Sequence, residues 1–175
     1  MTSTKRVRVW DLPQRLFHWS LVACFATAWF TADDAGPVHH WAGYGAVMLV
    51  AFRLVWGFVG SHHARFADFV PRPGELWDYL KRVLRRREPP YLGHNPAAAV
   101  MILFLLVAVT AIGISGWWLT TDAGWGSGPG EALHEWLAEL TLAAVAVHVT
   151  AAIYESIHLR ENLVRAMIDG TKRAR

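Results

Sequence analysis

Two histidines placed fourteen residues apart are the side chains in this sequence best suited to hold a cofactor. His134 and His148 lie in the largely apolar stretch 133–158. Fourteen residues of α-helix turn through about 1400°, roughly 40° short of four whole turns, and rise by about 21 Å. Both imidazoles therefore leave one face of the predicted helix, at two depths. An ionisable side chain inside an apolar span is costly without a partner, so the spacing predicts two bound groups.

The composition indicates that this helix belongs to a membrane protein. Hydrophobic residues make up 54% of the 175 residues and charged residues 18%, and there are ten Trp. The single cysteine, Cys24, excludes both an internal disulfide and a C-x-x-C-H haem attachment site. No small-residue cleavage site follows the short basic N-terminus, so we expect a retained first span and not a removed signal peptide.

Four segments are apolar enough to be predicted as membrane spans. Turns containing Gly, Pro and acidic residues follow the first and third, and a longer basic segment follows the second. The four segments cover about 14–32, 38–60, 97–120 and 132–158. We therefore expect an all-α integral membrane protein, a single domain over residues 1–175 built as a four-transmembrane-helix bundle. Between the second and third spans, residues 74–87 combine Arg and Lys with apolar residues at helical spacing. They predict a short amphipathic helix lying on the membrane surface.

The positive charges predict the orientation of the bundle. The N-terminal segment, the loop 61–96 and the C-terminal tail hold 16 of the 17 Lys and Arg residues, and Arg53 is the other. The loops 33–37 and 121–131 hold none. By the positive-inside rule both termini and the amphipathic helix are cytoplasmic. The basic charge is thus accounted for by topology and anionic lipid, and gives no case for nucleic-acid binding.

With this orientation the histidines form two pairs at two depths. His18, near the cytoplasmic end of the first span, matches the inner His148, and His39, at the outer end of the second span, matches His134. Two neutral imidazoles from different helices can fill both axial positions of a haem iron. Two haems stacked in this way would carry single electrons across most of the bilayer. A zinc site is the weaker interpretation, because zinc takes three or four converging protein ligands.

Each assignment has a plainer alternative. The four histidines could be structural imidazoles or polar helix ends, and His40 competes with His39 for the outer site. Arg53 follows His39 by fourteen residues, which places it on the same helix face at the inner level. It could contact a propionate of the inner haem, or its side chain could extend to the cytoplasmic surface. Four histidines beyond the span ends are expected to be solvated: His62, His63, His94 and His158.

Five motifs together resemble the bacterial cytochrome b561 and nickel-iron hydrogenase b-type cytochrome family. They are VWDLPQRLFHW at 9–19, HHWAGY at 39–44, FRLVWGFVGS at 52–61, LHEWLAE at 133–139 and VHVTAAIYES at 147–156. The resemblance implies that the first, second and fourth helices give four histidines to two b-type haems. These are His18, His39, His134 and His148, the same four that depth matching selects. The family's H-x-x-x-G pattern fits His39 with Gly43 and so favours His39 over His40.

The resemblance also implies a function and a location. We expect a multi-pass protein of the bacterial inner membrane that relays electrons between the quinone pool and a periplasmic redox partner, such as a cytochrome c or a dehydrogenase subunit. An alternative is a membrane anchor of a larger dehydrogenase, hydrogenase or cytochrome c complex. Whether the chain acts alone as a quinone oxidoreductase, or pairs as a homodimer, stays open. An alternative from another class is a small histidine-containing transporter or structural membrane subunit without haem.

Overall fold

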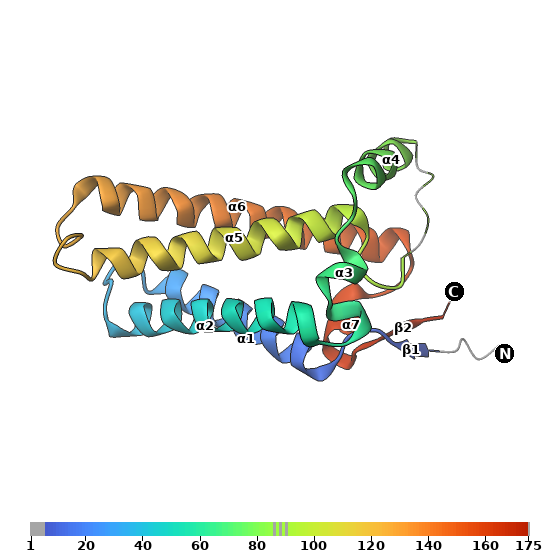
Figure 1. Cartoon of the computed structure of the whole chain (residues 1–175), viewed down its shortest axis with the longest axis horizontal. Coiled ribbons are helices and arrows are strands. Elements are labelled where there is room, and N and C mark those ends of the chain that lie inside the picture. The colour runs from blue at the N-terminus through green and yellow to red at the C-terminus, as the bar shows by residue number, and fades with distance from the viewer. Residues whose placement is uncertain (1–5, 86, 88, 90, 175) are drawn as a thin grey trace. The chain divides into compact units, whose positions relative to one another are not determined.

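The computed structural model describes residues 6–85, 87, 89 and 91–174 (Figure 1). Four long helices form close to the predicted segments. They are α1 (Leu12–Phe30), α2 (Pro37–Val59), α5 (Pro96–Leu119) and α6 (Gly128–His158). Three of them, α2, α5 and α6, are long and apolar enough to cross a membrane. α1 is not among these three because Gln14, Arg15 and His18 lower the hydropathy of its first half. The first predicted span therefore stays a prediction.

The connecting segments form short elements. They are β1 (Arg6–Arg8), η1 (His62–Ala64), α3 (Phe66–Phe69), α4 (Pro73–Leu84), α7 (Leu163–Asp169) and β2 (Thr171–Arg173). α4 occupies the predicted amphipathic segment, with Trp77 and Leu84 exposed and Tyr79 buried. The sequence did not lead us to expect β1 and β2, which pair as a two-stranded antiparallel sheet.

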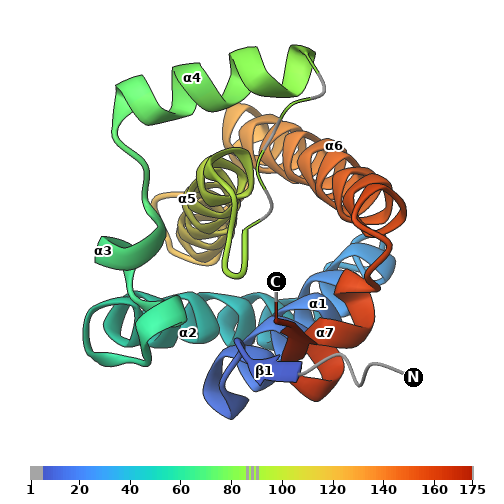
Figure 2. The same cartoon turned by 90° about the vertical axis from the view of Figure 1, so that its right-hand side faces the viewer.

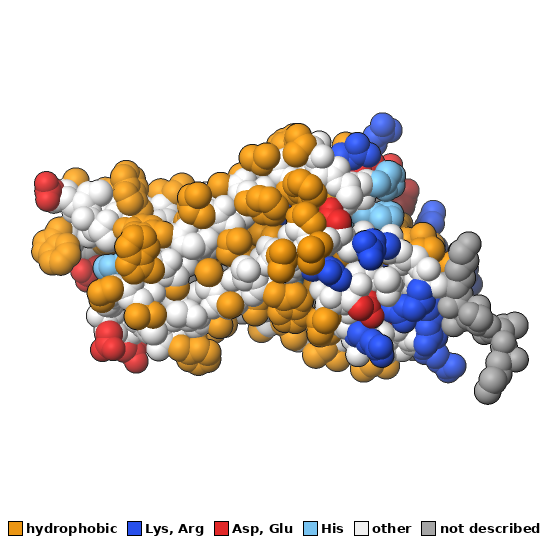
Figure 3. Space-filling model, turned by 90° about the horizontal axis from the view of Figure 1, so that it is seen from below, with side chains coloured by type: hydrophobic (Ala, Val, Ile, Leu, Met, Phe, Trp, Pro, Cys, Tyr) orange, Lys and Arg blue, Asp and Glu red, His pale blue; other side chains and the backbone are white. Residues whose placement is uncertain are grey.

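The chain divides into two compact units, and each long helix contributes to both. Unit 1 comprises Met1–Arg15, Val55–Leu103 and Val147–Arg175, and unit 2 comprises Leu16–Leu54 and Phe104–Ala146. Among the residues that the structure describes, every Lys and Arg except Arg53 lies in unit 1. On the face shown in Figure 3 the Lys and Arg side chains gather on unit 1.

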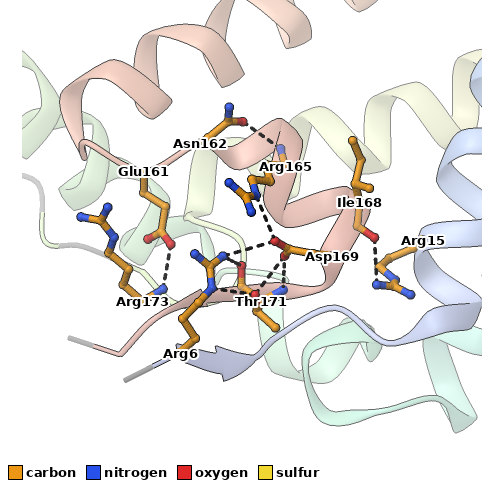
Figure 4. Close-up of polar contacts among 9 residues, drawn as sticks. All are labelled: Arg6, Arg15, Glu161, Asn162, Arg165, Ile168, Asp169, Thr171 and Arg173. Atoms are coloured by element: carbon orange, nitrogen blue, oxygen red, sulfur yellow. Dashed lines mark hydrogen bonds and ion pairs between the residues drawn. The ribbon is translucent and has the colours of Figure 1, made fainter. Parts of the chain in front are cut away.

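Within unit 1 the two ends of the chain are held together. Figures 1 and 2 show β1, β2 and α7 side by side. Figure 4 shows the contacts: the Arg6 Nε donates to Thr171 Oγ1 at 2.8 Å, and the Arg15 Nη1 donates to the Ile168 carbonyl at 2.9 Å. Gly170 ends α7 in the left-handed region with a φ of 81°. A Cβ at this position would lie 2.6 Å from the Trp10 carbonyl oxygen, so only glycine fits the close approach of the two terminal segments.

Asp11 joins the start of α1 to the end of α2. Its Oδ1 accepts from the Gln14 amide at 2.7 Å, which makes Asp11 the N-cap of α1. Its Oδ2 accepts from Trp56 Nε1 at 3.1 Å and from Ser61 Oγ at 2.5 Å. Two of the motifs, WDLP and LVWGFVGS, thus meet at one carboxylate in unit 1.

His94, which we expected to be solvated, packs against other residues of unit 1. Its ring centroid lies 4.4 Å from that of Trp10 and 5.1 Å from that of Phe69, so the imidazole is packed among aromatic rings. Lys172 is buried beside the same cluster, with its Nζ 5.2 Å from the Trp10 ring centroid. His94 lies ten residues after the end of α4, and its contacts with Trp10 and Phe69 draw it into the interior of unit 1. His62 and His158 are exposed as expected, and His63 is half-buried.

In unit 2, glycines let the helices approach one another. A Cβ at Gly45 of α2 would lie 3.1 Å from the Cys24 Sγ of α1. A Cβ at Gly113 of α5 would overlap Val47 of α2. Small residues at such crossings allow the close packing on which helix association in membranes depends.

We expect Asp11→Ala to lower the melting temperature of the detergent-purified protein by about 4 °C, because a cap and two further hydrogen bonds are lost. Circular dichroism measures this, and Asp34→Ala, at an exposed site, is the control that should leave the melting temperature unchanged.

Burial raises the pKa of Asp11, but hydrogen bonds from Ser61, Gln14 and Trp56 outweigh the effect of burial, and the pKa is lowered from 3.8. Its stabilising effect is therefore present above the unfolded-state pKa and is lost as the pH falls through the lower folded-state value. Equal melting temperatures of Asp11→Ala and the wild type would contradict this role.

We expect Gly113→Ala to destabilise the protein, because the added methyl overpacks the α2–α5 contact by about 1–3 kcal/mol, more than the gain of about 1 kcal/mol in helix propensity. The measurement is the melting temperature, with Gly36→Ala as the matched control because a Cβ there meets no atom within 4 Å. The double variant Val47→Ala/Gly113→Ala should recover part of the loss. If the melting temperature of the double variant falls by more than the two single decreases added together, the contact between Gly113 and Val47 is not the cause of the destabilisation.

Candidate functional site

Unit 2 brings two of the predicted ligands face to face. His39, in the first turn of α2, and His134, in the second turn of α6, have ring centroids 6.1 Å apart and ring planes inclined by 75°. A metal ion between two imidazoles, with metal–nitrogen bonds of about 2 Å, separates the ring centroids by about 6 Å. The separation of the predicted outer pair therefore fits a shared iron.

Each ring of this pair is hydrogen-bonded at its Nδ1, and Nε2 is the nitrogen that would bind a metal. The His39 Nδ1 lies 2.9 Å from the Ala28 carbonyl oxygen of α1. A carbonyl oxygen can only accept, so the Nδ1 carries the proton and the Nε2 keeps its lone pair. Metal-bound histidines commonly have their other nitrogen bonded in this way, which sets both the tautomer and the orientation of the ring.

α5 contacts the second ring of the pair. The His134 Nδ1 lies 2.9 Å from Ser115 Oγ, and a Cβ at Gly116 would lie 2.9 Å from His134 Cε1. Sequence reasoning missed Ser115, since α5 has no histidine. The available signal was a hydroxyl in the sequence GISG within an apolar span whose one other hydroxyl is that of Thr110.

The space beside Gly43, close to His39 on α2, is open. Gly43 lies one turn after His39 on α2, and a Cβ at Gly43 would meet no atom within 4 Å. His40 is exposed, whereas His39 is half-buried and faces His134. The geometry of unit 2 therefore favours His39 over His40 as the outer ligand, in agreement with the H-x-x-x-G pattern.

The predicted inner group is divided between the two units. His18 and Arg53 belong to unit 2 and His148 to unit 1, so their grouping stays a prediction. Both histidines are half-buried. Arg53 has no exposed surface, although the alternative of a side chain extended to the cytoplasmic surface would expose its guanidinium.

Comparison with known proteins gives one family. The family model described as prokaryotic cytochrome b561 matches residues 9–170. A probable Ni/Fe-hydrogenase B-type cytochrome subunit of Azotobacter vinelandii is 30% identical over 94% of this chain and 87% of the relative. Proteins described in the same words are 28% identical in Rhodobacter capsulatus, over 94% of this chain and 80% of the relative, and 28% identical in Bradyrhizobium diazoefficiens, over 97% and 87%. No solved structure matches significantly.

The relatives contain segments that this chain lacks. The 209 positions aligned with the Azotobacter vinelandii protein include about 165 residues of this chain, so about 45 positions are filled by the relative alone. These additional residues lie within the aligned region.

The family match extends over all five motifs and all four long helices. It confirms the resemblance seen in the sequence and the expectation of an all-α membrane protein. The b-type name implies noncovalent haem b, as the lack of a C-x-x-C-H site requires. The chain belongs to the prokaryotic cytochrome b561 family, and it is a multi-pass membrane b-type cytochrome of electron transport.

Proposed function

We propose that this cytochrome holds two haems b and relays electrons across the bacterial inner membrane, between the quinone pool and a periplasmic redox partner. One observation carries the proposal: His39 and His134 face each other from two helices with ring centroids 6.1 Å apart. Haem b, when bound, supplies reversible one-electron transfer at its iron. Membership in a b-type cytochrome family leaves the haem-free transporter or structural subunit without support.

His18 and His148 form the second site of the proposal. α6 is continuous from Gly128 to His158, so His148 is displaced from His134 by about 21 Å along one helix. A single haem cannot use both histidines of α6 over this separation. His18, in the second turn of α1, is the partner that depth matching assigns to His148.

The proposed topology has four spans, α1, α2, α5 and α6, with both termini cytoplasmic. The charge distribution supports it, since the segments assigned to the cytoplasm hold every Lys and Arg except Arg53. α4 then lies in the cytoplasmic loop, where its exposed Trp77 and Leu84 and its basic residues suit contact with the lipid surface. This orientation places the His39–His134 pair near the periplasm.

The names of the relatives point to the periplasmic partner. Relatives of similar sequence are described as Ni/Fe-hydrogenase B-type cytochrome subunits, so a Ni/Fe hydrogenase is the partner we propose first. The second candidate is a different dehydrogenase or a cytochrome c, or quinone oxidation by the cytochrome alone. The approximately 45 aligned positions that this chain lacks favour this second candidate, because any partner contact made there is lost.

Reduction by hydrogen separates these partners. Native membranes containing the tagged chain are solubilised in mild detergent, and the haem absorption of the purified complex is followed under H2 and then with a quinol. Reduction by H2 together with a stoichiometric hydrogenase supports the first partner. If quinol but not H2 reduces the haem, and no hydrogenase co-purifies with the chain, the first partner is contradicted and the second candidate is favoured.

Haem content tests the two-site assignment. We expect two haems per wild-type chain by pyridine haemochrome assay. His39→Ala and His134→Ala should each remove the same component of the redox titration, and His18→Ala and His148→Ala the other, because two ligands share each iron. His40→Ala is the matched control and should keep both. Loss of different components in the first two variants would refute the outer pair.

Arg53→Leu tests the proposed contact with a propionate of the inner haem. Removing a buried positive charge destabilises the reduced haem, so the potential of the inner haem should fall, by about 59 mV if the equilibrium constant for reduction changes tenfold. Arg82→Leu removes an exposed charge from α4 and is the control that should shift neither potential. The contact is wrong if Arg53→Leu leaves both potentials at their wild-type values.

A further inference from the structure

We infer that Ser115 of α5 fixes the proton of His134 on its Nδ1 and thereby sets the potential of the outer haem. This inference rests on the proposed function, because it requires His134 to ligate that haem. Ser115 acts through His134 and is therefore a positioning residue. It gives a role in the site to the one long helix that has no predicted ligand.

The direction of the hydrogen bond follows from counting protons. Ser115 Oγ lies 2.9 Å from the Ile112 carbonyl oxygen and 2.9 Å from the His134 Nδ1. A hydroxyl has one proton, and a carbonyl oxygen has none to give. The Ser115 hydroxyl donates to the Ile112 carbonyl, and a proton given there is not available to the imidazole, so towards His134 the same oxygen accepts. The His134 Nδ1 must carry a proton and donate it, which leaves the lone pair on the Nε2.

The adjacent residue holds the ring in this position. A Cβ at Gly116 would come within 2.9 Å of His134 Cε1 and 3.4 Å of its Nδ1, so the ring lies directly against the backbone of α5. Ser115 and Gly116 thus contact the same edge of the imidazole, one as hydrogen-bond acceptor and one by close packing. The same Cβ position is farther, 3.7 Å, from the His134 Nε2.

The two rings of the outer pair are oriented by different kinds of acceptor. His39 donates to a backbone carbonyl, that of Ala28, which no substitution can remove. His134 is bonded to a side chain, that of Ser115, and its ring also has a backbone hydrogen bond with Ile112. Of these two acceptors, Ser115 is the one whose identity the sequence can change. It is therefore the position through which substitution can alter the electron density on an axial ligand without altering the ligand itself.

The sign of the effect follows from charge. An Nδ1–H that donates a hydrogen bond makes the imidazole more electron-rich, and an electron-rich ligand stabilises the oxidised iron. Loss of the acceptor should therefore raise the potential of the outer haem. The inner haem has other ligands in the proposal and should keep its potential.

The test compares the redox titrations of Ser115→Ala, Ser115→Thr and wild type as purified holoproteins, with haem content measured on each. Ser115→Ala should retain two haems and raise the outer potential, by about 59 mV for a tenfold change in the equilibrium constant for reduction. Ser115→Thr keeps the hydroxyl and should restore the wild-type value. Thr110→Ala is the matched control, because Thr110 also bonds back to its own helix, with its Oγ1 2.7 Å from the Leu106 carbonyl. It should shift neither potential.

The outcomes separate this inference from the proposed function. Two haems in the wild type, with both potentials unmoved by Ser115→Ala, would overturn the inference alone, as would a shift confined to the inner haem or an equal shift in Thr110→Ala. Fewer than two haems in the wild type would refute the proposed function and the inference with it. If Ser115→Ala is not recovered folded, Ser115→Cys offers a weaker acceptor of similar shape and should give a smaller rise. A fall or no change with Ser115→Cys overturns the inference.

Discussion

The site depends on how an imidazole is satisfied in apolar surroundings. A neutral histidine has one donor and one acceptor nitrogen, and burial makes an unpaired nitrogen costly. In unit 2 the structure pairs the Nδ1 of each facing histidine with an oxygen, the Ala28 carbonyl for His39 and the Ser115 hydroxyl for His134. The Nε2 of each ring is then the atom that an iron can use. The same constraint that makes these histidines costly therefore leaves the Nε2 of each ring for the ligation that we propose.

Close approach of the helices makes these bonds available. Gly45 lies against Cys24, Gly113 against Val47, and Gly116 against His134. Each is a point at which a side chain on one helix would hold its neighbour away. Because the hydrogen-bonding oxygens lie on helices other than those that carry the histidines, the packing of α1 and α5 is part of the chemistry of the pair.

Unit 1 has a different role, in which polar residues of the motifs hold helix ends and chain ends together. Asp11 connects α1 to Trp56 and Ser61, and the two ends of the chain pair as β1 and β2. Motif residues such as Asp11, Trp56 and Ser61 thus stabilise the fold, in addition to the motif histidines that we propose as haem ligands. His94, packed against Trp10, is another example of a histidine whose surroundings are structural.

The sequence by itself determined the membrane class, the positions of the long helices, the family and the candidate histidines. These depend on composition, on the apolar length of each segment and on the fixed rise and turn of a helix, which are local properties. The H-x-x-x-G pattern already favoured His39 over His40, but only the tertiary structure decided that His39 faces His134 and that Ser115 and the Ala28 carbonyl contact the two rings. It also brought His94 into an aromatic cluster and paired the terminal strands. These contacts join segments far apart in the chain, so neither periodicity nor spacing within one helix contains them.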